Sequence, residues 1–354
     1  MLDAAIKNFN LPWHQHDRYW IGVYAKGGDF SAATLDVLQK AGLHRLDDHG
    51  MAIATERQWN VKWDEIYTAL QKIGALAAIE VTLTAGETLP VGPPERKSPD
   101  AVHELAQSLW LGNAVLEGRL MCYLQPVLSG RGKIFGYESF ARAKAADGSI
   151  IGGDKIIAAA KILGIEYVID RHLQVQAIKT FVSSQFDGFL FVNFLPGFIH
   201  RPDVYLEGLS DTVKNFGIIA KHIVLDFTKS ETPRDIKHLM GVCDYGRSRG
   251  YSIALDDIES LEGAQKLLEI RPDFVKIDMR MVRKVAEPES RDIIRQIVEL
   301  VHAIGATVIG EGVETEDIHQ ALKQLGVDLF QGYLFSPPMP VETVMKKSSS
   351  AATF

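Results

Sequence analysis

Polar side chains recur at the ends of apolar runs in the later part of the chain. These residues are Glu138, Asn193, Asp226, the pair Asp256-Asp257, Lys276, Glu311 and Gln331. A single acid after a strand is usually a helix cap or a solvated loop residue. Capping does not explain Glu138 and Lys276, which lie within apolar runs, nor why each run should meet a polar residue. The series therefore predicts one shared polar site.

The chemistry of this series indicates divalent cations. Carboxylates that face one point repel one another unless cations neutralise them. Oxygen ligands with an amide among them favour Mg2+ or Mn2+ over zinc. The adjacent acids Asp256 and Asp257 allow one carboxylate to bridge two ions, and such a pair of ions promotes in-line displacement at phosphorus. Lys276 adds a positive charge that could bind the attacking water or stabilise the charge that develops.

The apolar runs predict strands, and the amphipathic segments between them predict helices. The expected strands are 119–128, 134–143, 188–193, 222–227, 252–256, 274–277, 307–310 and 329–331. Repeated βα units of this length favour a parallel sheet covered by helices. They predict an α/β fold, a TIM-like (β/α)8 barrel with an antiparallel first strand. In such barrels the functional residues lie at the C-terminal rim, where the polar residues above fall.

The chain before the barrel predicts a separate small unit. Its segments follow the order βαββαβ, which is typical of an α/β sandwich of ferredoxin-like type. We expect helices over 31–41, capped by Ser31, and over 63–73, and a last strand over 76–83. The predicted division is a small, regulatory α/β domain over 1–84, a Gly- and Pro-rich linker over 85–98, the barrel domain over 99–345, opened by one helix over 99–117, and a flexible tail over 346–354.

The composition excludes several other classes of protein. The 354 residues carry 38 basic and 45 acidic side chains, and the net charge of −7 disfavours binding to duplex nucleic acid. Two cysteines are too few for a disulfide framework or a cysteine-based zinc site. The N-terminus has no signal-peptide pattern, and no apolar run reaches the roughly 18 residues that span a bilayer. We therefore expect a cytoplasmic protein that binds no membrane.

Seven short motifs, in order and in register, resemble the EAL-domain family. They are Glu138-Ser139-Phe140-Ala141-Arg142, Asn193-Phe194-Leu195-Pro196, Asp226-Phe227-Thr228, Asp256-Asp257, Lys276-Ile277-Asp278, Glu311-Gly312-Val313-Glu314 and Gln331-Gly332-Tyr333-Leu334-Phe335. The segment 123–126, Tyr-Leu-Gln-Pro, is similar to the opening strand of that family. The resemblance implies a TIM-like barrel that binds cyclic di-GMP and hydrolyses it to linear pGpG with two Mg2+ or Mn2+ ions.

The resemblance also implies a role for each matching residue. The metal ligands would be Glu138, Asn193, Asp226, Asp256, Asp257 and Glu311. Lys276 matches the lysine that orients or deprotonates the attacking water, and Glu311 would act beside it. The contacts to guanine or phosphate would be Gln125, Arg142, Asp170 and Gln331. A homodimer or a signalling protein partner is also expected.

The sequence departs from the family at several positions. Phe140 stands where the name-giving motif has leucine. Asp226 replaces a glutamate, so its carboxylate is one methylene shorter, and Lys229 replaces an acid. Asp256 and Asp257 are followed by Ile258-Glu259 instead of Phe-Gly, which removes the backbone freedom of glycine from this loop. An ion pair between Glu259 and Lys229 would restore a contact there.

These residues leave three functions open. A slow or regulated cyclic di-GMP phosphodiesterase is favoured by the nearly complete ligand set and by Lys276. A catalytically weak or inactive receptor that acts through protein partners is favoured by Asp226, Lys229 and the altered loop. An interaction module without nucleotide binding is disfavoured by Gln125, Arg142 and Asp170. We predict the phosphodiesterase, with the receptor as the alternative.

Overall fold

The computed structural model describes residues 18–27, 29–46, 50–56, 59–85, 95–194, 201–228 and 236–349. The chain forms two compact units. The first comprises residues 1–119 with 154–166, and the second comprises residues 120–153 with 167–354.

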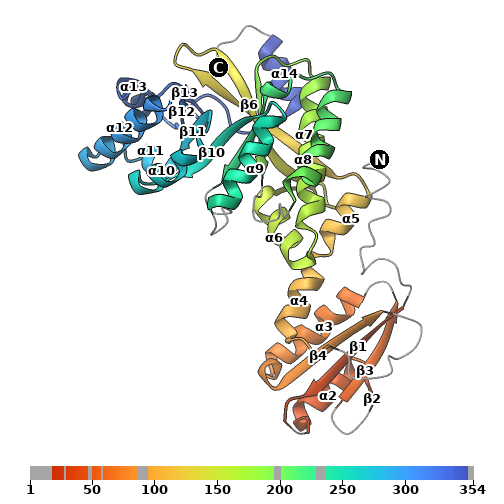
Figure 1. Ribbon diagram of the computed structural model, residues 1–354. Helices are drawn as coiled ribbons and strands as arrows, with labels where there is room; N and C mark the ends of the chain where they lie inside the picture. Colours follow the sequence, from red (N-terminus) through yellow and green to blue (C-terminus); the bar gives the residue numbers. More distant parts are fainter. Residues whose placement is uncertain are drawn as a thin grey trace. The chain divides into compact units, whose positions relative to one another are not determined.

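The first unit contains a four-stranded antiparallel sheet with the strand order β2-β3-β1-β4. Its elements are β1 (Arg18–Ala25), α2 (Ala32–Lys40), β2 (His44–Arg45), β3 (Gly50–Glu56), α3 (Trp59–Lys72) and β4 (Ile79–Ala85). The succession βαββαβ and the central position of the first and third strands are those of a ferredoxin-like α/β sandwich. The predicted class of this unit is therefore the observed one (Figure 1).

Element limits in this unit follow local capping and packing. The Ser31 hydroxyl accepts a hydrogen bond from the Thr34 amide and caps α2, as predicted. Helix α3 begins at Trp59, earlier than predicted, and buries Trp59 and Trp63 completely. The predicted start of the last strand is wrong, because residues 76–78 form the 3-10 helix η1 (Leu76–Ala78) before β4 begins.

Two helices replace the single helix predicted over 99–117. They are α4 (Pro99–Ser108) and α5 (Trp110–Leu116). Between them the Leu109 amide donates to the Ala106 carbonyl, and this shorter-range bond tightens the turn and ends α4. Both helices, together with α6 (Gly153–Leu163), group with the first unit. The domain limits stated above remain a prediction.

The second unit contains a closed barrel of eight strands. In barrel order these are β5 (Leu120–Ser129), β6 (Ile134–Lys144), β8 (Phe189–Phe194), β9 (Ile223–Thr228), β10 (Ser252–Ile258), β11 (Phe274–Ile277), β12 (Thr307–Gly310) and β13 (Leu329–Phe330). Strand β5 runs antiparallel to its neighbours β6 and β13, and the other neighbours pair in parallel. The predicted barrel with an antiparallel first strand is confirmed.

Helices connect the strands and cover the outside of the barrel (Figure 1). They are α7 (Glu166–Ser183), α8 (Pro202–Asn215), η3 (Ala220–His222), α9 (Ile236–Ser248), α10 (Leu261–Leu267), η5 (Leu268–Ile270), α11 (Met279–Val282), α12 (Pro288–Ala303), α13 (Glu316–Gln324) and α14 (Val341–Ser349). Two short strands, β7 (Ile150–Gly152) and β14 (Met339–Pro340), extend the sheet beside β6 and β5 and were not predicted. Helix α14 ends at Ser349, so residues 346–349 of the predicted tail are helical, and the limits of the tail stay a prediction.

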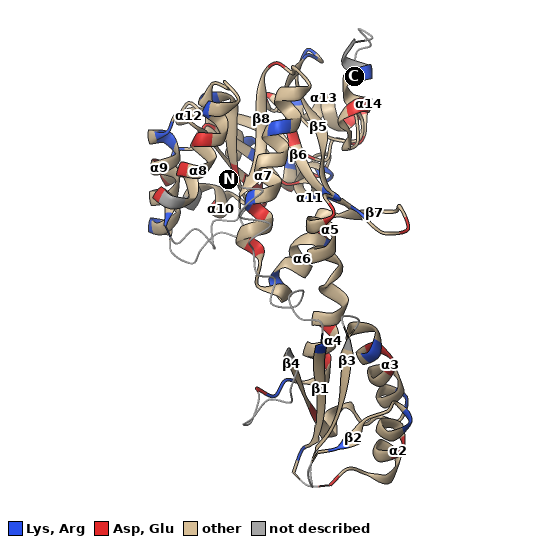
Figure 2. Cartoon of the chain, turned by 90° about the vertical axis from the view of Figure 1, so that its right-hand side faces the viewer, with Lys and Arg blue, Asp and Glu red and all other residues tan. Residues whose placement is uncertain are grey.

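Charge and hydropathy over the described residues agree with the composition. No helix there combines the length and the apolar character needed to cross a bilayer. Figure 2 shows both basic and acidic residues on the helices of the chain.

Candidate active site at the barrel mouth

Strand periodicity places the predicted polar residues in one layer of the barrel interior. The layer below is apolar and consists of Val127, Phe191, Val224, Ala254, Phe274, Ile309 and Leu329. Side chains alternate between the two faces of a strand, so the residue two positions along points to the same side. Two positions from each of these apolar residues, toward the mouth of the barrel, lie Gln125, Asn193, Asp226, Asp256, Lys276, Glu311 and Gln331. Gln125 comes before Val127 in the sequence because β5 runs antiparallel to its neighbours. The apolar floor thus carries a polar layer at the mouth.

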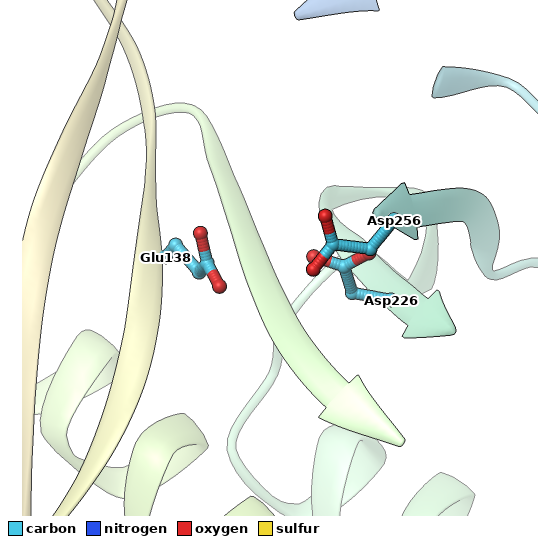
Figure 3. A group of neighbouring side chains, drawn as sticks. All are labelled: Glu138, Asp226 and Asp256. Atoms are coloured by element: carbon cyan, nitrogen blue, oxygen red, sulfur yellow. The ribbon is translucent and has the colours of Figure 1, made fainter. Parts of the chain in front are cut away.

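Four carboxylates surround the ammonium group of Lys276. Its Nζ lies 3.0 Å from Glu138 Oε2, 3.0 Å from Asp226 Oδ2, 3.3 Å from Asp256 Oδ2 and 2.7 Å from Glu311 Oε1. The Lys276 and Asp226 side chains are fully buried. Figure 3 shows the carboxyl groups of Glu138, Asp226 and Asp256 turned toward one another. Because an ammonium has three hydrogens, Lys276 cannot donate to all four acids at once.

Burial and mutual repulsion shift the ionisation of this cluster. Burial raises the pKa of Asp226 and of Glu311 well above the usual carboxyl range, and neighbouring acids raise it further, although Lys276 opposes both effects. Burial alone would lower the pKa of Lys276, but the surrounding carboxylates outweigh it and raise that pKa well above its ordinary value. Lys276 is therefore a fixed cation in this arrangement.

A second group of acids adjoins the first. Asp256, Asp257 and Glu311 each offer an oxygen within 4.8 Å of the others, as Glu138, Asp226 and Asp256 do. Asp256 belongs to both groups, as the predicted bridging role requires. Asp257 adopts a left-handed backbone conformation with φ 57°, which costs energy for a residue other than glycine. Its amide donates to Asp256 Oδ1 at 2.7 Å, and burial, then Asp256 and Asp278, raise its pKa to about 6.

Two buried oxygens in this layer lack a hydrogen-bond donor. They are Asp226 Oδ1 and Gln331 Oε1. A buried oxygen without a partner costs about 1–3 kcal/mol, so it indicates a missing cation or donor. The five carboxylates and Lys276 also leave a large excess of negative charge when all are ionised. Oxygen donors with this charge fit hard divalent cations such as Mg2+ or Mn2+.

Amide side chains connect the acids to the rim. Gln331 Nε2 donates to Glu138 Oε2 at 2.9 Å and to Gln125 Oε1 at 3.0 Å. Gln125 Nε2 donates in turn to the Ser336 carbonyl at 2.9 Å. Asn193 Nδ2 lies 3.3 Å from Glu138 Oε1, so Asn193 joins the cluster as predicted.

A cavity of about 530 Å³ opens above the polar layer. Its lining residues are Gln125, Glu138, Phe140, Arg142, Asn193, Asp256, Asp257, Met279, Arg283, Glu311, Gly312, Glu314, Gln331, Gly332, Tyr333 and Pro338. Asp226 and Lys276 do not line it, because they are buried behind its wall. The Arg142 guanidinium lies near the rings of Tyr123 and Phe140 and donates to the Ala141 carbonyl.

Asp170 is the one predicted site residue that the structure brings neither to this cavity nor to the acid cluster around Lys276. It lies on α7, is buried, and does not line the cavity. Its carboxylate accepts hydrogen bonds from the Tyr205 hydroxyl and from Gln174 Nε2. The contact of Asp170 with a ligand stays a prediction, and in this arrangement side chains of α7 and α8 donate to its carboxylate.

The departures from the family pattern have different structural outcomes. Asp226 reaches Lys276 and the neighbouring acids although its side chain is short. The proposed pair of Glu259 with Lys229 falls outside the described residues, because Lys229 lies in the undescribed segment 229–235. Glu259 instead pairs with Arg280 at 2.6 Å, and Arg280 also binds Asp278 at 2.8 Å.

Sequence reasoning missed several lining residues. The cavity is also lined by Met279 and Arg283, which are the first residue and the C-cap of α11 after β11, and by Glu314 and Tyr333, which follow β12 and β13 outside regular structure. Strand periodicity stops at the rim and says nothing about such residues. Their closeness to the predicted motifs in sequence was the available signal.

Comparisons with known proteins agree with this geometry. The profile of the EAL domain matches residues 109–338. "Probable cyclic di-GMP phosphodiesterase PdeI" of Escherichia coli (strain K12) is 28% identical over 255 residues, which are 68% of this chain and 32% of that protein. The chain spans about a third to a half of the length of the first curated relatives.

Solved structures share the fold. An EAL domain protein from Listeria monocytogenes EGD-e superposes with a TM-score of 0.62 at 24% identity and covers 70% of this chain and 98% of that one. A standalone EAL protein from Vibrio cholerae O395, in its c-di-GMP bound form, gives a TM-score of 0.55 at 26% identity and covers 63% of this chain and 93% of that one. Both matches therefore include most of the solved chain.

Proposed function

Because the chain belongs to the EAL domain family, we propose that its barrel binds cyclic di-GMP at the mouth and hydrolyses it to linear pGpG. The observation that carries the proposal is the convergence of Glu138, Asp226, Asp256 and Glu311 on Lys276 beneath an open cavity. Such a concentration of buried charge costs stability unless a ligand or cation uses it. The names of the relatives supply the substrate class.

The acid groups would hold two divalent cations. Glu138, Asn193, Asp226 and Asp256 would bind one ion, and Asp256, Asp257 and Glu311 would bind the other. Two such ions, when bound, make water a better nucleophile and offset charge on the phosphate in the transition state. The oxygens without partners, Asp226 Oδ1 and Gln331 Oε1, support this assignment.

The remaining side chains of the mouth would position the substrate. Lys276 stays protonated at neutral pH, so it favours orienting the carboxylates and water over removing a proton. Arg142 offers a planar fork of donors to a phosphate, and no carboxylate partner of Arg142 is found among the described residues. Gln125 and Gln331 hold Glu138 and the rim segment at Ser336 in register. Hydrolysis adds one water across one phosphodiester bond and opens the ring.

The receptor alternative is supported by a specific feature of the same site. Lys276 already forms ion pairs with four carboxylates, so a positive charge occupies the centre of the cluster without any added cation. Such a centre would bind the nucleotide with weak metal affinity and little turnover. The expected cytoplasmic location and the expected homodimer or protein partner remain predictions.

Hydrolysis of cyclic di-GMP by the purified chain tests the proposal. We expect linear pGpG in the presence of Mn2+ or Mg2+ and none in a chelator. Glu138→Gln should lower turnover at least about 100-fold, because it removes one ligand charge at unchanged side-chain size. Glu299→Gln, on the outer face of α12, is the matched control and should leave turnover unchanged.

Each other outcome has a distinct meaning. Tight binding without product in either metal would reject the phosphodiesterase and support the receptor. A titration that detects no binding of cyclic di-GMP would reject both. Circular dichroism of Glu138→Gln separates loss of chemistry from loss of folding.

A further inference from the structure

Strand β10 carries one extra residue opposite β11, at the position of the two adjacent acids. Leu255 of β10 pairs with Val275 of β11. The next pair joins Ile258 to Ile277, so β10 advances by three residues where β11 advances by two. Alternation along an unbroken strand would turn two adjacent side chains to opposite faces. The extra residue forms a bulge that re-aims the strand, so both acids of Asp256-Asp257 line the cavity.

This bulge contains an unfavourable backbone conformation. Asp257 has a φ of 57°, in the left-handed region that residues other than glycine rarely adopt. Such a conformation persists only where the surrounding structure fixes it. The Asp278 amide donates to the Ile258 carbonyl at 3.2 Å, which ties the end of the bulge to the segment after β11. The contacts that reinforce this bond therefore decide how firmly Asp257 is held.

The Arg280 guanidinium bridges the segments that follow β10 and β11. Its Nη2 donates to Glu259 Oε1 at 2.6 Å, and its Nε donates to Asp278 Oδ1 at 2.8 Å. The Arg280 amide also donates to Asp278 Oδ1, at 2.7 Å, where Asp278 caps the N-terminus of α11. The Asp278 carboxylate in turn interacts with the Asp257 side chain. These contacts join Arg280 to Asp257 on one side and to Glu259 on the other.

Arg280 and Glu259 form this bridge outside the cavity. Neither residue lines it, and 64% of the Arg280 side chain is exposed together with 41% of the Glu259 side chain. The bridge therefore acts on the site through the acids that it holds. Glu259 also belongs to the pair Ile258-Glu259 that stands in place of the Phe-Gly of the family, so this bridge uses an acid that the family pattern lacks.

Resting on the proposed two-cation function, we propose that Arg280 is a positioning residue for the second cation. It holds the bulge so that the Asp257 carboxylate faces the site that it shares with Asp256 and Glu311. The first proposed cation takes no ligand from Asp257, so it depends less on the bridge.

The sign of the expected effect separates position from charge. A guanidinium near the acids repels a divalent cation, so removal of its charge alone would tighten Mn2+ binding. Removal of a group that holds Asp257 in place would weaken Mn2+ binding instead. Weaker binding of the second ion to Arg280→Ala therefore identifies the positioning role.

Titration of the full chain with Mn2+, followed by calorimetry without nucleotide, tests this inference. We expect Arg280→Ala to weaken binding of the second ion about tenfold and to change binding of the first ion little. Arg280→Lys should restore only part of the affinity, because lysine lacks the fork that reaches both acids. Glu259→Gln added to Arg280→Ala should weaken the second ion little further, since the two residues act through one bridge. In a chelator, hydrogen exchange of the amides at 257–260 should be faster in Arg280→Ala than in wild type.

Arg295→Ala is the matched control, because Arg295 forms an exposed ion pair with Asp292 on α12 and does not line the cavity. It should change neither Mn2+ affinity nor hydrogen exchange. Unchanged or tighter binding of the second ion to Arg280→Ala would overturn the inference, as would equal weakening of both ions. Unchanged hydrogen exchange in Arg280→Ala would also overturn it. Uptake of a single ion by the wild-type chain would instead reject the two-cation function on which the inference rests.

Discussion

The barrel mouth and the sheet of the first unit bury very different side chains. The first unit packs Tyr19, Trp59 and Trp63 against its sheet without exposure, and its buried polar side chains among the described residues are the uncharged Thr34, Thr82 and Ser108. The barrel mouth buries Lys276 and Asp226 just as completely, with no exposed surface. Burial of aromatic side chains stabilises the folded state, whereas burial of charged side chains destabilises it. The contrast marks the mouth as the region whose residues serve a purpose other than stability.

The largest expected effect comes from the conventional core. Trp63→Ala removes a fully buried ring from α3 and should destabilise the first unit by about 3–5 kcal/mol. Thermal unfolding measures the loss, and Mn2+ binding at the mouth should be unchanged. Val61→Ala, on the exposed side of the same helix, is the control and should shift the midpoint little. A loss of Mn2+ binding with Trp63→Ala would show that the two regions are not independent.

A smaller effect of opposite sign is expected at the mouth. Asp226→Asn removes one acid from a crowded, fully buried cluster and leaves Lys276 with three others. In a chelator we expect the free energy of unfolding to rise by about 1–3 kcal/mol, because one desolvated charge is lost. Mn2+ affinity and turnover should both fall. A variant that is less stable than wild type in chelator would mean that Asp226 is a structural partner of Lys276.

The third prediction concerns pH and depends on Asp257. Its pKa is raised to about 6 in the folded chain, so the folded state binds more protons than the unfolded state between about pH 4 and 6. The resulting stability is present below pH 4 and is lost as pH rises through 6. In chelator we expect a decrease of about 1–2 kcal/mol, since solvent screens this half-buried group.

Asp257→Asn provides the control for this pH dependence. Chemical denaturation at pH 4, 5, 6 and 7 should give a flatter profile for the variant than for wild type. Asp226 and Glu311, whose pKa values are also raised, contribute with the same sign and should leave a residual slope. Mn2+ should oppose the decrease by favouring the ionised acids. A wild-type profile that rises between pH 4 and 6 would contradict the assignment.

Much of the barrel was predictable because one periodicity governs both its core and its mouth. Phe274 and Lys276 are two positions apart on one strand, as are Ile309 and Glu311 on another. This spacing places the polar residue on the same face of the strand as the apolar one. The same reasoning applies to each parallel strand, so the acids could be expected to converge. Their individual contacts, such as the four acids around Lys276, depend on barrel closure and could not be read from one strand.

The remainder depends on contacts that no periodicity encodes. Asp170 matches a motif position, yet Tyr205 from another helix takes its carboxylate. Arg283 and Glu314 come from the separate segments after β11 and β12, and they pair where Gly312 packs closely against Met279. In the first unit, the 3-10 helix η1 takes the first residues of a segment whose composition suits a strand. Tertiary packing decided each of these cases.

The ammonium group of Lys276 has three hydrogens but four neighbouring carboxylates, so it cannot donate a hydrogen bond to each of them. This shortage of donors has a practical consequence. Under the proposed two-cation site, this shortage favours uptake of divalent ions from any buffer that contains them. Preparations purified in different salts would then carry different occupants and give rates that disagree. Stripping the chain with a chelator and restoring one ion at a time is therefore the starting point for measuring its chemistry.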